Sequence, residues 1–232
     1  MQLSKIHATH LVFDCYGTLI DWESGILNAL RPFLLSQGCS LSDQEILELY
    51  GRFEPIAEAG DFRIYRKVLA QVMRLFGQHF GFQPTATSEM LLAQSIQDWQ
   101  PFPDTVPALQ RLATRFKLNI LSNIDRDLII HSQAHLQVRF SQVMTAQDIG
   151  SYKPAPANFH YALQKMAVAP AKVLHVAQSL YHDIAPAQAL GLRTIWVNRR
   201  KGKTGSGATP PAAVKPDWEI NNLADLADLL GC

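Results

Sequence analysis

The sequence has few cysteines, almost no excess of either charge and no long uninterrupted run of apolar residues. Its 232 residues include three cysteines, Cys15, Cys39 and Cys232, too few and too widely spaced for a disulfide framework or a structural zinc site. The net charge of +1 gives no electrostatic signature of binding to nucleic acid or to a membrane surface. No segment has the apolar length of a membrane-spanning helix or of a signal peptide core. We therefore expect a cytoplasmic protein with neither nucleic acid nor membrane among its partners.

What the sequence does contain is the composition of a globular enzyme. Apolar residues make up 47% and charged residues 18% of the chain, which are ordinary shares for a folded globular protein. A chain of 232 residues is long enough for one core domain with an inserted segment. Two stretches of different periodicity, residues 21–97 and residues 101–230, favour such a division.

Residues 21–97 show the periodicity of amphipathic helices throughout. A capping box, in which Ser42 faces Glu45, marks the start of one of these helices. The spacing of apolar and capping residues predicts helices over 21–35, from Ser42 onward, over 62–80, and from Thr87 or Ser88 through Ile96.

From residue 101 onward, apolar runs of strand length alternate with helical patterns. The predicted strands cover 118–121, 143–145, 173–177, 194–197 and 218–220. The predicted helices begin near Pro103 and cover 127–135, 156–166, 183–190 and 223–230. Strands separated by helices of this length pair in parallel, so we expect an α/β protein.

The stretch 199–211 is rich in Gly, Lys, Ser and Pro. Its composition predicts a mobile surface loop. The basic residues Arg199, Arg200, Lys201 and Lys203 are expected to be solvated there, and an anionic partner is the less favoured alternative.

The first strand of the predicted sheet ends in an acidic residue. Leu11, Val12 and Phe13 form an apolar run without polar alternation, which is typical of a strand buried on both faces. Asp14 follows directly, and Gly17 supplies a turn. A carboxylate at this position lies where open α/β sheets bind their ligands, and it can act as a nucleophile. The alternative is an aspartate that only caps the junction between strand and loop.

Residues 13–19, Phe-Asp-Cys-Tyr-Gly-Thr-Leu, resemble the first motif of the haloacid dehalogenase superfamily. The resemblance implies that Asp14 attacks the substrate. Phosphatases of the superfamily carry a second aspartate two residues later as the acid for the leaving group, where this chain has Tyr16. An aromatic residue there resembles the type II 2-haloacid dehalogenases. A halide leaves as an anion and needs no proton, so the loss of the acid is chemically consistent with this branch.

Two further segments resemble the second and third motifs of the superfamily. The strand over 118–121 ends in Ser122 and Asn123, and Lys153 lies between Tyr152 and Pro154. The resemblance implies that Ser122 orients the nucleophile or holds an anion, and that Lys153 neutralises both the nucleophile and the departing anion. Taken alone, Ser122 is equally typical of a helix N-cap, and a loop lysine is usually a solvated charge.

The fourth segment, residues 176–183, departs most from the family pattern. Phosphatases of the superfamily bind Mg²⁺ through an aspartate where this chain has Gln178, and a neutral amide is a poor ligand for Mg²⁺. We therefore expect no metal and no cofactor. Asp183 resembles the late carboxylate that handles the hydrolytic water, although an N-cap of the following helix is the simpler alternative.

The resemblance covers essentially the whole chain and implies its organisation. It implies a Rossmann-like, doubly wound parallel sheet core, residues 1–20 and 98–232, with a helical cap inserted at 21–97. The implied partner is a small anionic substrate, and a homodimer is left open. The substrate-binding candidates are Cys15, Tyr16, Asn123, Ser179 and, as the cap arginine, Arg52 in preference to Arg63 or Arg66.

The favoured function is hydrolytic dehalogenation of a small 2-haloacid to a 2-hydroxyacid through an ester on Asp14. The candidate catalytic residues are Asp14, Thr18, Ser122, Lys153 and Asp183. One alternative is a Mg²⁺-dependent phosphohydrolase that uses Gln178 and Asp183. The other is a non-catalytic binding protein on the same scaffold, indicated by Leu180 and Phe159 where the dehalogenases carry polar residues.

Overall fold

The computed structural model describes residues 7–205 and 207–232 and contains one six-stranded sheet in which every strand pair is parallel. The strand order is β3-β2-β1-β4-β5-β6. The strands are β1 (His10–Phe13), β2 (Lys117–Ser122), β3 (Gln142–Thr145), β4 (Val173–Ala177), β5 (Arg193–Val197) and β6 (Trp218–Ile220). The order reverses between β1 and β4, as in a doubly wound sheet, so the predicted α/β fold class is confirmed.

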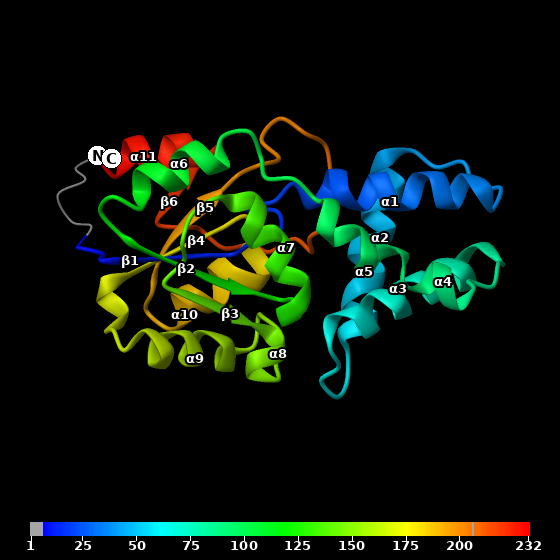
Figure 1. The fold of residues 1–232 in the computed structure, drawn as a ribbon, viewed down its shortest axis with the longest axis horizontal. Helices are drawn as coiled ribbons and strands as arrows, with labels where there is room; N and C mark the ends of the chain where they lie inside the picture. The colour runs from blue at the N-terminus through cyan, green and yellow to red at the C-terminus, as the bar shows by residue number, and fades with distance from the viewer. Residues whose placement is uncertain (1–6, 206) are drawn as a thin grey trace.

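Helices cover both faces of the sheet. In Figure 1, α6 (Thr105–Leu112) and α11 (Leu223–Leu229) lie above it, and α9 (Pro156–Met166) and α10 (Ala185–Ala189) lie below it. Two further helices, α7 (Arg126–Leu136) and α8 (Ala146–Ile149), precede and follow β3 along the chain. Both sheet faces are therefore buried, as parallel strands require.

The side-chain alternation of β1 explains why its last three residues, Leu11, Val12 and Phe13, are all apolar. Leu11 and Phe13 belong to a large core cluster that includes residues of α6 and α11. Val12 points to the other face, where it packs in a second cluster with Phe159 of α9. Successive residues of a strand face opposite sides of a sheet, so a strand buried on both sides favours apolar residues at successive positions.

The helices between β1 and α6 lie beyond the carboxyl ends of the strands, at the right of Figure 1. We call these the cap helices. They are α1 (Trp22–Ser36), α2 (Asp43–Glu58), α3 (Tyr65–Phe80), α4 (Ala86–Glu89), α5 (Leu91–Ser95) and η1 (Ile96–Asp98). The division of the chain into two domains at residues 20 and 98 stays a prediction. Among the described residues, no helix is long and apolar enough to cross a membrane.

The capping and spacing patterns of the sequence predict some helix starts correctly and place others at the wrong residue. The capping box of Ser42 and Glu45 forms as predicted. The long cap helix starts at Tyr65 rather than at Phe62. Its N-cap residue, Ile64, makes no side-chain cap, and the carboxylate of Asp125 accepts from the N–H groups of Tyr65 and Arg66 instead. The prediction that Thr87 or Ser88 starts a helix was wrong, because the side chain of Thr85 accepts the capping hydrogen bond from the N–H of Ser88.

The segment after β4 also differs from the prediction. A single helix was expected over 183–190, but the chain forms a π-helical turn, Leu180–Ile184, before α10. Ser179 is the N-cap of this turn, and its side chain accepts from the N–H of His182. Asp183 therefore lies inside the turn and is not a helix cap.

The prediction of a solvated loop over 199–211 was wrong for its two arginines. The guanidinium of Arg199 donates to the carbonyl of Thr18 at 2.9 Å and lies 4.0 Å from the ring centroid of Phe102. Arg200 pairs with Glu23 of α1. Composition indicates a loop but cannot show that a long arginine side chain reaches a buried partner.

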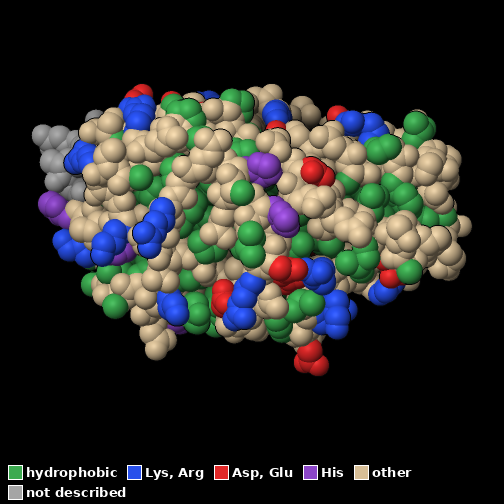
Figure 2. Space-filling model, in the orientation of Figure 1, with side chains coloured by type: hydrophobic (Ala, Val, Ile, Leu, Met, Phe, Trp, Pro, Cys, Tyr) green, Lys and Arg blue, Asp and Glu red, His purple; other side chains and the backbone are tan. Residues whose placement is uncertain are grey.

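The surface carries both basic and acidic side chains, as the nearly equal numbers of the two in the sequence predict (Figure 2). Figure 2 shows mostly basic side chains toward the left end of the face that it displays, and basic and acidic side chains mixed over the rest.

Candidate active site

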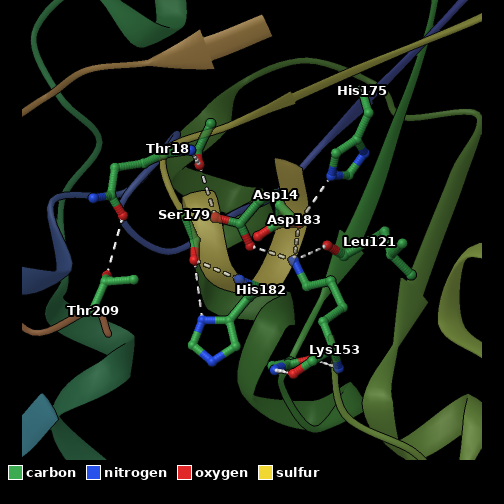
Figure 3. A network of polar contacts seen from close by, with 11 residues as sticks. Asp14, Thr18, Leu121, Lys153, His175, Ser179, His182, Asp183 and Thr209 are labelled. Atoms are coloured by element: carbon green, nitrogen blue, oxygen red, sulfur yellow. Dashed lines mark hydrogen bonds and ion pairs between the residues drawn. The ribbon is translucent and has the colours of Figure 1, made fainter. Parts of the chain in front are cut away.

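The predicted catalytic residues come together at the carboxyl edge of the sheet. Asp14 follows β1, Ser122 ends β2, and Ser179 follows β4. Carboxyl ends of neighbouring parallel strands meet at one edge, and the crevice where the strand order reverses lies between β1 and β4. Figure 3 shows Asp14, Lys153 and Asp183 pointing toward one another at this edge.

Asp14 is buried, and each of its carboxylate oxygens has a donor. The Oγ1 of Thr18 donates to Oδ2 at 2.7 Å, and the Nζ of Lys153 donates to Oδ1 at 2.9 Å. The turn that returns Thr18 to Asp14 depends on Gly17, whose φ of 89° lies in the region that favours glycine. Burial raises the pKa of Asp14, and Lys153 and Thr18 oppose that rise by stabilising the anion.

Lys153 is buried at the centre of the site. Its Nζ donates to Asp14, to Asp183 at 2.7 Å and to the carbonyl of Leu121 at 3.0 Å, which uses all three ammonium protons. Burial lowers the pKa of Lys153, but the two carboxylates outweigh it and the pKa lies above its ordinary value. Asn123 clamps the lysine backbone, because its side chain accepts from the Lys153 N–H and donates to the Lys153 carbonyl.

Asp183 is held by a residue that the sequence analysis did not select. The Nε2 of His175, in β4, lies 2.8 Å from Oδ1 of Asp183. Burial opposes ionisation of Asp183, but Lys153 and His175 together lower its pKa to about 2. Asp183 is therefore a carboxylate at every pH at which the protein is expected to work.

The floor of the site offers hydrogen-bond donors to a bound anion. The hydroxyl of Ser122 lines the cavity and has no partner among the described residues. The N–H groups of Tyr16 and Asn123 likewise donate to no described residue. Cys15 was predicted to bind substrate, but its side chain is buried in the core cluster, so only its main chain can take part.

Tyr16 is not placed to act as an acid for a leaving group. Its hydroxyl is 2.9 Å from the Oγ of Ser132, and burial raises its pKa well above the ordinary value. Ser179, another predicted substrate-binding residue, lines the cavity, and its hydroxyl is bonded to the backbone and ring of His182.

The site does not fit the Mg²⁺ that phosphatases of the superfamily bind. The Nζ of Lys153 lies between one oxygen of Asp14 and one of Asp183 and already neutralises both carboxylates. Gln178 offers only a neutral amide oxygen, which accepts from Thr209 at 3.3 Å. Within 7–205 and 207–232, no group of three or more His, Cys, Asp or Glu side chains could hold a metal ion.

The cap helices close the site over a small cavity of about 50 Å³. Its wall includes two acidic residues of α2, Glu54 and Glu58. The other lining side chains from the cap helices and from the residue that follows them are aromatic: Trp22, Tyr65 and Trp99.

The cap arginine expected to bind the substrate is not at the cavity. Arg52 lies on the exposed side of α2, in a separate groove with Glu48 and His79, so that prediction was wrong. The two alternatives do not line the cavity either. Arg63 donates to the carbonyl of Ala57, and Arg66 pairs with Asp127.

Sequence reasoning missed three residues around the catalytic carboxylates: His175, Glu54 and Glu58. A signal existed for His175, because it is the polar residue in an otherwise apolar strand. A weaker one existed for Glu54, which occupies the apolar face of α2 with Tyr50 and Phe53. Glu58 had no signal, because its position at a helix end is ordinary for a solvated residue.

Comparisons with known proteins identify the family. The protein-family model of haloacid dehalogenase-like hydrolases matches residues 8–191 of this chain. The chain is 26% identical to (S)-2-haloacid dehalogenase 1 of Pseudomonas sp. strain CBS-3, over 94% of this chain and 95% of that protein. It is 27% identical to the glyceraldehyde 3-phosphate phosphatase of Methanocaldococcus jannaschii, over 99% of this chain and 89% of that protein.

A solved structure shares the fold over nearly the whole chain. It is the L-2-haloacid dehalogenase of Xanthobacter autotrophicus with chloropropionic acid covalently bound, with a TM-score of 0.79, 22% identity and coverage of 97% of this chain and 98% of that one. The family match extends from before the strand that carries Asp14 to beyond Asp183. The chain therefore belongs to the haloacid dehalogenase-like hydrolases.

Proposed function

We propose that this hydrolase cleaves the carbon–halogen bond of a small 2-haloacid and releases halide and a 2-hydroxyacid. The observation that carries the proposal is the pair of contacts around Asp14. Lys153 and Thr18 hold its two oxygens, while the residue two positions later, Tyr16, cannot supply the proton that an alkoxide leaving group needs. A halide needs no such proton.

In the first step, Asp14 attacks the α-carbon. Thr18 and Lys153 fix the orientation of its carboxylate. Alignment of the reacting atoms accounts for a large part of the rate enhancement in such a step. The substrate carboxylate accepts hydrogen bonds from the Ser122 hydroxyl and from the N–H groups of Tyr16 and Asn123. The carbon–oxygen bond forms, the carbon–halogen bond breaks, and its electron pair leaves with the halide.

In the second step, water attacks the carboxyl carbon of the Asp14 ester. The free oxygen of Asp183 accepts a hydrogen bond from that water, while its other oxygen stays bonded to Lys153 and His175. Lys153 stabilises the negative charge that develops on the ester as the tetrahedral intermediate forms. The proton that the water loses passes by way of Asp183 to the alkoxide oxygen of the substrate. The 2-hydroxyacid then leaves, and Asp14 is regenerated with one oxygen from water.

The two relatives compared above do not separate dehalogenation from phosphate ester hydrolysis. One of the two relatives above is a haloacid dehalogenase and the other a phosphatase, at nearly the same identity. What favours dehalogenation is the site itself, where Gln178 offers a neutral amide in place of the aspartate that binds Mg²⁺ in the phosphatases.

The proposal is tested by measuring two products from one purified enzyme. Halide release is followed over a panel of 2-haloacids, and phosphate release over a panel of phosphate esters with Mg²⁺ added. We expect halide release alone, abolished in Asp14→Asn. Phosphate release without halide release would replace the proposal with a phosphohydrolase, and binding without turnover, retained in Asp14→Asn, would replace it with a binding protein.

A further inference from the structure

The cap wall of the cavity presents acid groups to the substrate. Glu54 and Glu58 are one helical turn apart on α2, so they share a face of the helix, and both line the cavity together with Asp14. The carboxyl group of Glu54 accepts hydrogen bonds from the hydroxyls of Tyr50 and Tyr65, which hold it in place. Among the described residues that line the cavity, Lys153 is the one lysine or arginine, and its protons are used.

Displacement at carbon determines which part of the substrate meets this wall. The nucleophile, the carbon and the leaving group lie nearly on a line in such a step. Asp14 attacks from the edge of the sheet, so the halogen points away from the sheet toward the cap helices, which lie beyond that edge in Figure 1. The acid groups of α2 are therefore placed on the leaving-group side.

The protonation state of Glu54 and Glu58 decides whether they assist or oppose the departure of the halide. An ionised carboxylate would repel a departing halide, whereas a carboxylic acid can donate a hydrogen bond to it. Burial, followed by the neighbouring charge of Glu54, raises the pKa of Glu58 to about 9, against the opposing effect of Lys153. Burial also raises the pKa of Glu54. Near neutral pH, Glu58 has a proton to donate.

We propose that Glu58, one helical turn from Glu54 on the cavity wall, is a specificity residue that donates a hydrogen bond to the departing halide and selects fluoride over bromide or iodide. The proposal rests on the proposed dehalogenation. Fluoride is the strongest hydrogen-bond acceptor among the halides, so it gains most from a neutral donor. The cavity volume of about 50 Å³, room for a few water-sized groups, also favours the smallest halogen.

The proton of Glu58 is not transferred in this step. The bond from Asp14 to carbon forms as the carbon–fluorine bond breaks, and the electron pair leaves on fluoride. Hydrogen fluoride is a stronger acid than a carboxylic acid, so the proton stays on Glu58 while fluoride accepts its hydrogen bond. Glu58 thus assists departure as a donor and is unchanged at the end of the cycle.

The test compares 2-fluoro- and 2-bromopropionate in the full-length enzyme and three variants. Glu58→Gln keeps a neutral donor, Glu58→Leu removes it, and Glu48→Gln changes an acid on α2 that lines the separate groove instead of the cavity. We expect the ratio of kcat/KM for the fluoro acid to that for the bromo acid to fall at least about tenfold in Glu58→Leu. Glu58→Gln and Glu48→Gln should stay within about threefold of the wild-type ratio.

An unchanged ratio in Glu58→Leu, with bromo acid still turned over, overturns the role of Glu58 and leaves the dehalogenation intact. A wild type that releases no halide overturns the proposed function instead. In that case fluoride binding, followed by the fluorescence of Trp22 and Trp99 in the cavity wall, still tests the subsite. Weaker fluoride binding in Glu58→Leu than in Glu58→Gln supports a donor at this position, and equal binding overturns it.

Discussion

The Nε2 atom of His175 lies 2.8 Å from Oδ1 of Asp183, and both side chains are almost completely buried. Because a carboxylate can only accept, Nε2 carries the proton, and Nδ1 has no partner among the described residues. Lys153 donates to the same oxygen, so two donors fix the orientation of Asp183 and leave its other oxygen for the hydrolytic water. The ring of Phe159 packs edge-on against His175, with centroids 5.4 Å apart.

The first prediction concerns this contact. In His175→Leu, the carboxylate of Asp183 loses a donor, so its pKa rises from about 2 and the group protonates at higher pH. We expect the acid limb of the kcat profile to move to higher pH. His175→Gln keeps an N–H of similar reach and should move the limb less. Near-UV circular dichroism checks the fold, and an acid limb unmoved in a folded leucine variant contradicts the assignment.

The second prediction is that Lys153→Ala lowers kcat by at least about a hundredfold, because the site loses the charge that stabilises the developing anion. Loss of the cation leaves two buried carboxylates facing each other, which also destabilises the fold. Added ethylamine should therefore restore part of the activity and raise Tm by occupying the gap. A folded variant with wild-type turnover would show that Lys153 does not stabilise the developing anion.

The third prediction is that activity survives removal of metal ions. Lys153 takes the position between Asp14 and Asp183, and Gln178 offers no carboxylate. Halide release after dialysis against EDTA should equal that of the untreated enzyme within error. Turnover that disappears on chelation and returns with Mg²⁺ would refute the assignment of the chemistry to side chains.

The fourth prediction links Glu58 to stability. Its pKa is about 9 in the folded protein and near the ordinary value of 4.5 in the unfolded chain. A group with a raised folded pKa stabilises fully below its unfolded pKa, and this stability is lost as pH rises through the folded pKa. Between pH 7 and 9, above the titration of unfolded histidine, the Tm of the wild type should fall more than that of Glu58→Gln.

Other ionisable groups near Glu58 set the window for this measurement. The ones that line the same cavity or the adjoining cleft are Asp14, Tyr16, Glu54, Tyr65, Tyr152, Lys153, Tyr181, His182 and Asp183. Burial lowers the pKa of His182 to about 4, and the pKa of Asp183 is about 2, so neither changes charge in the folded protein between pH 7 and 9. Parallel Tm curves for wild type and Glu58→Gln would show that Glu58 is already ionised.

The sequence predicted the sheet and the meeting of Asp14, Ser122, Lys153 and Asp183 because each lies close to a strand end or in a motif of fixed spacing. Residues at the carboxyl ends of neighbouring parallel strands must be near one another, so order along the chain was enough. The roles of these residues remain proposals, and the structure brings the four together in one network or cavity.

The cap side of the site was not predictable in the same way. Helical periodicity shows which face of α2 is buried but not what that face meets, so Arg52 was chosen by charge although its position is on the exposed side. The sequence does not mark Glu54 or Glu58 as cavity residues, because acidic residues on a helix are usually solvated. Only the packing of the cap helices on the sheet edge shows that they face Asp14.

The last prediction separates two uses of Asp14 that the geometry alone allows. Asp14 could attack carbon and form an ester, or it could activate water for direct attack, and both routes invert the α-carbon. We favour the ester because Lys153 and Thr18 hold a buried, poorly hydrated carboxylate, and because Asp183 is available as a separate residue for the water. An ester on Asp14 is cleaved at its carboxyl carbon, so the oxygen from water enters the enzyme.

A single turnover in H₂¹⁸O with enzyme in excess tests this difference. We expect mass analysis to find one ¹⁸O atom in the peptide that contains Asp14 and none in the 2-hydroxyacid. A matched sample incubated without substrate controls for exchange of the carboxylate with solvent. Labelled 2-hydroxyacid with an unlabelled Asp14 peptide would exclude the ester and leave Asp14 as a general base. The same experiment with Asp183→Asn should leave the ester in place long enough to be detected, because the water then lacks its acceptor.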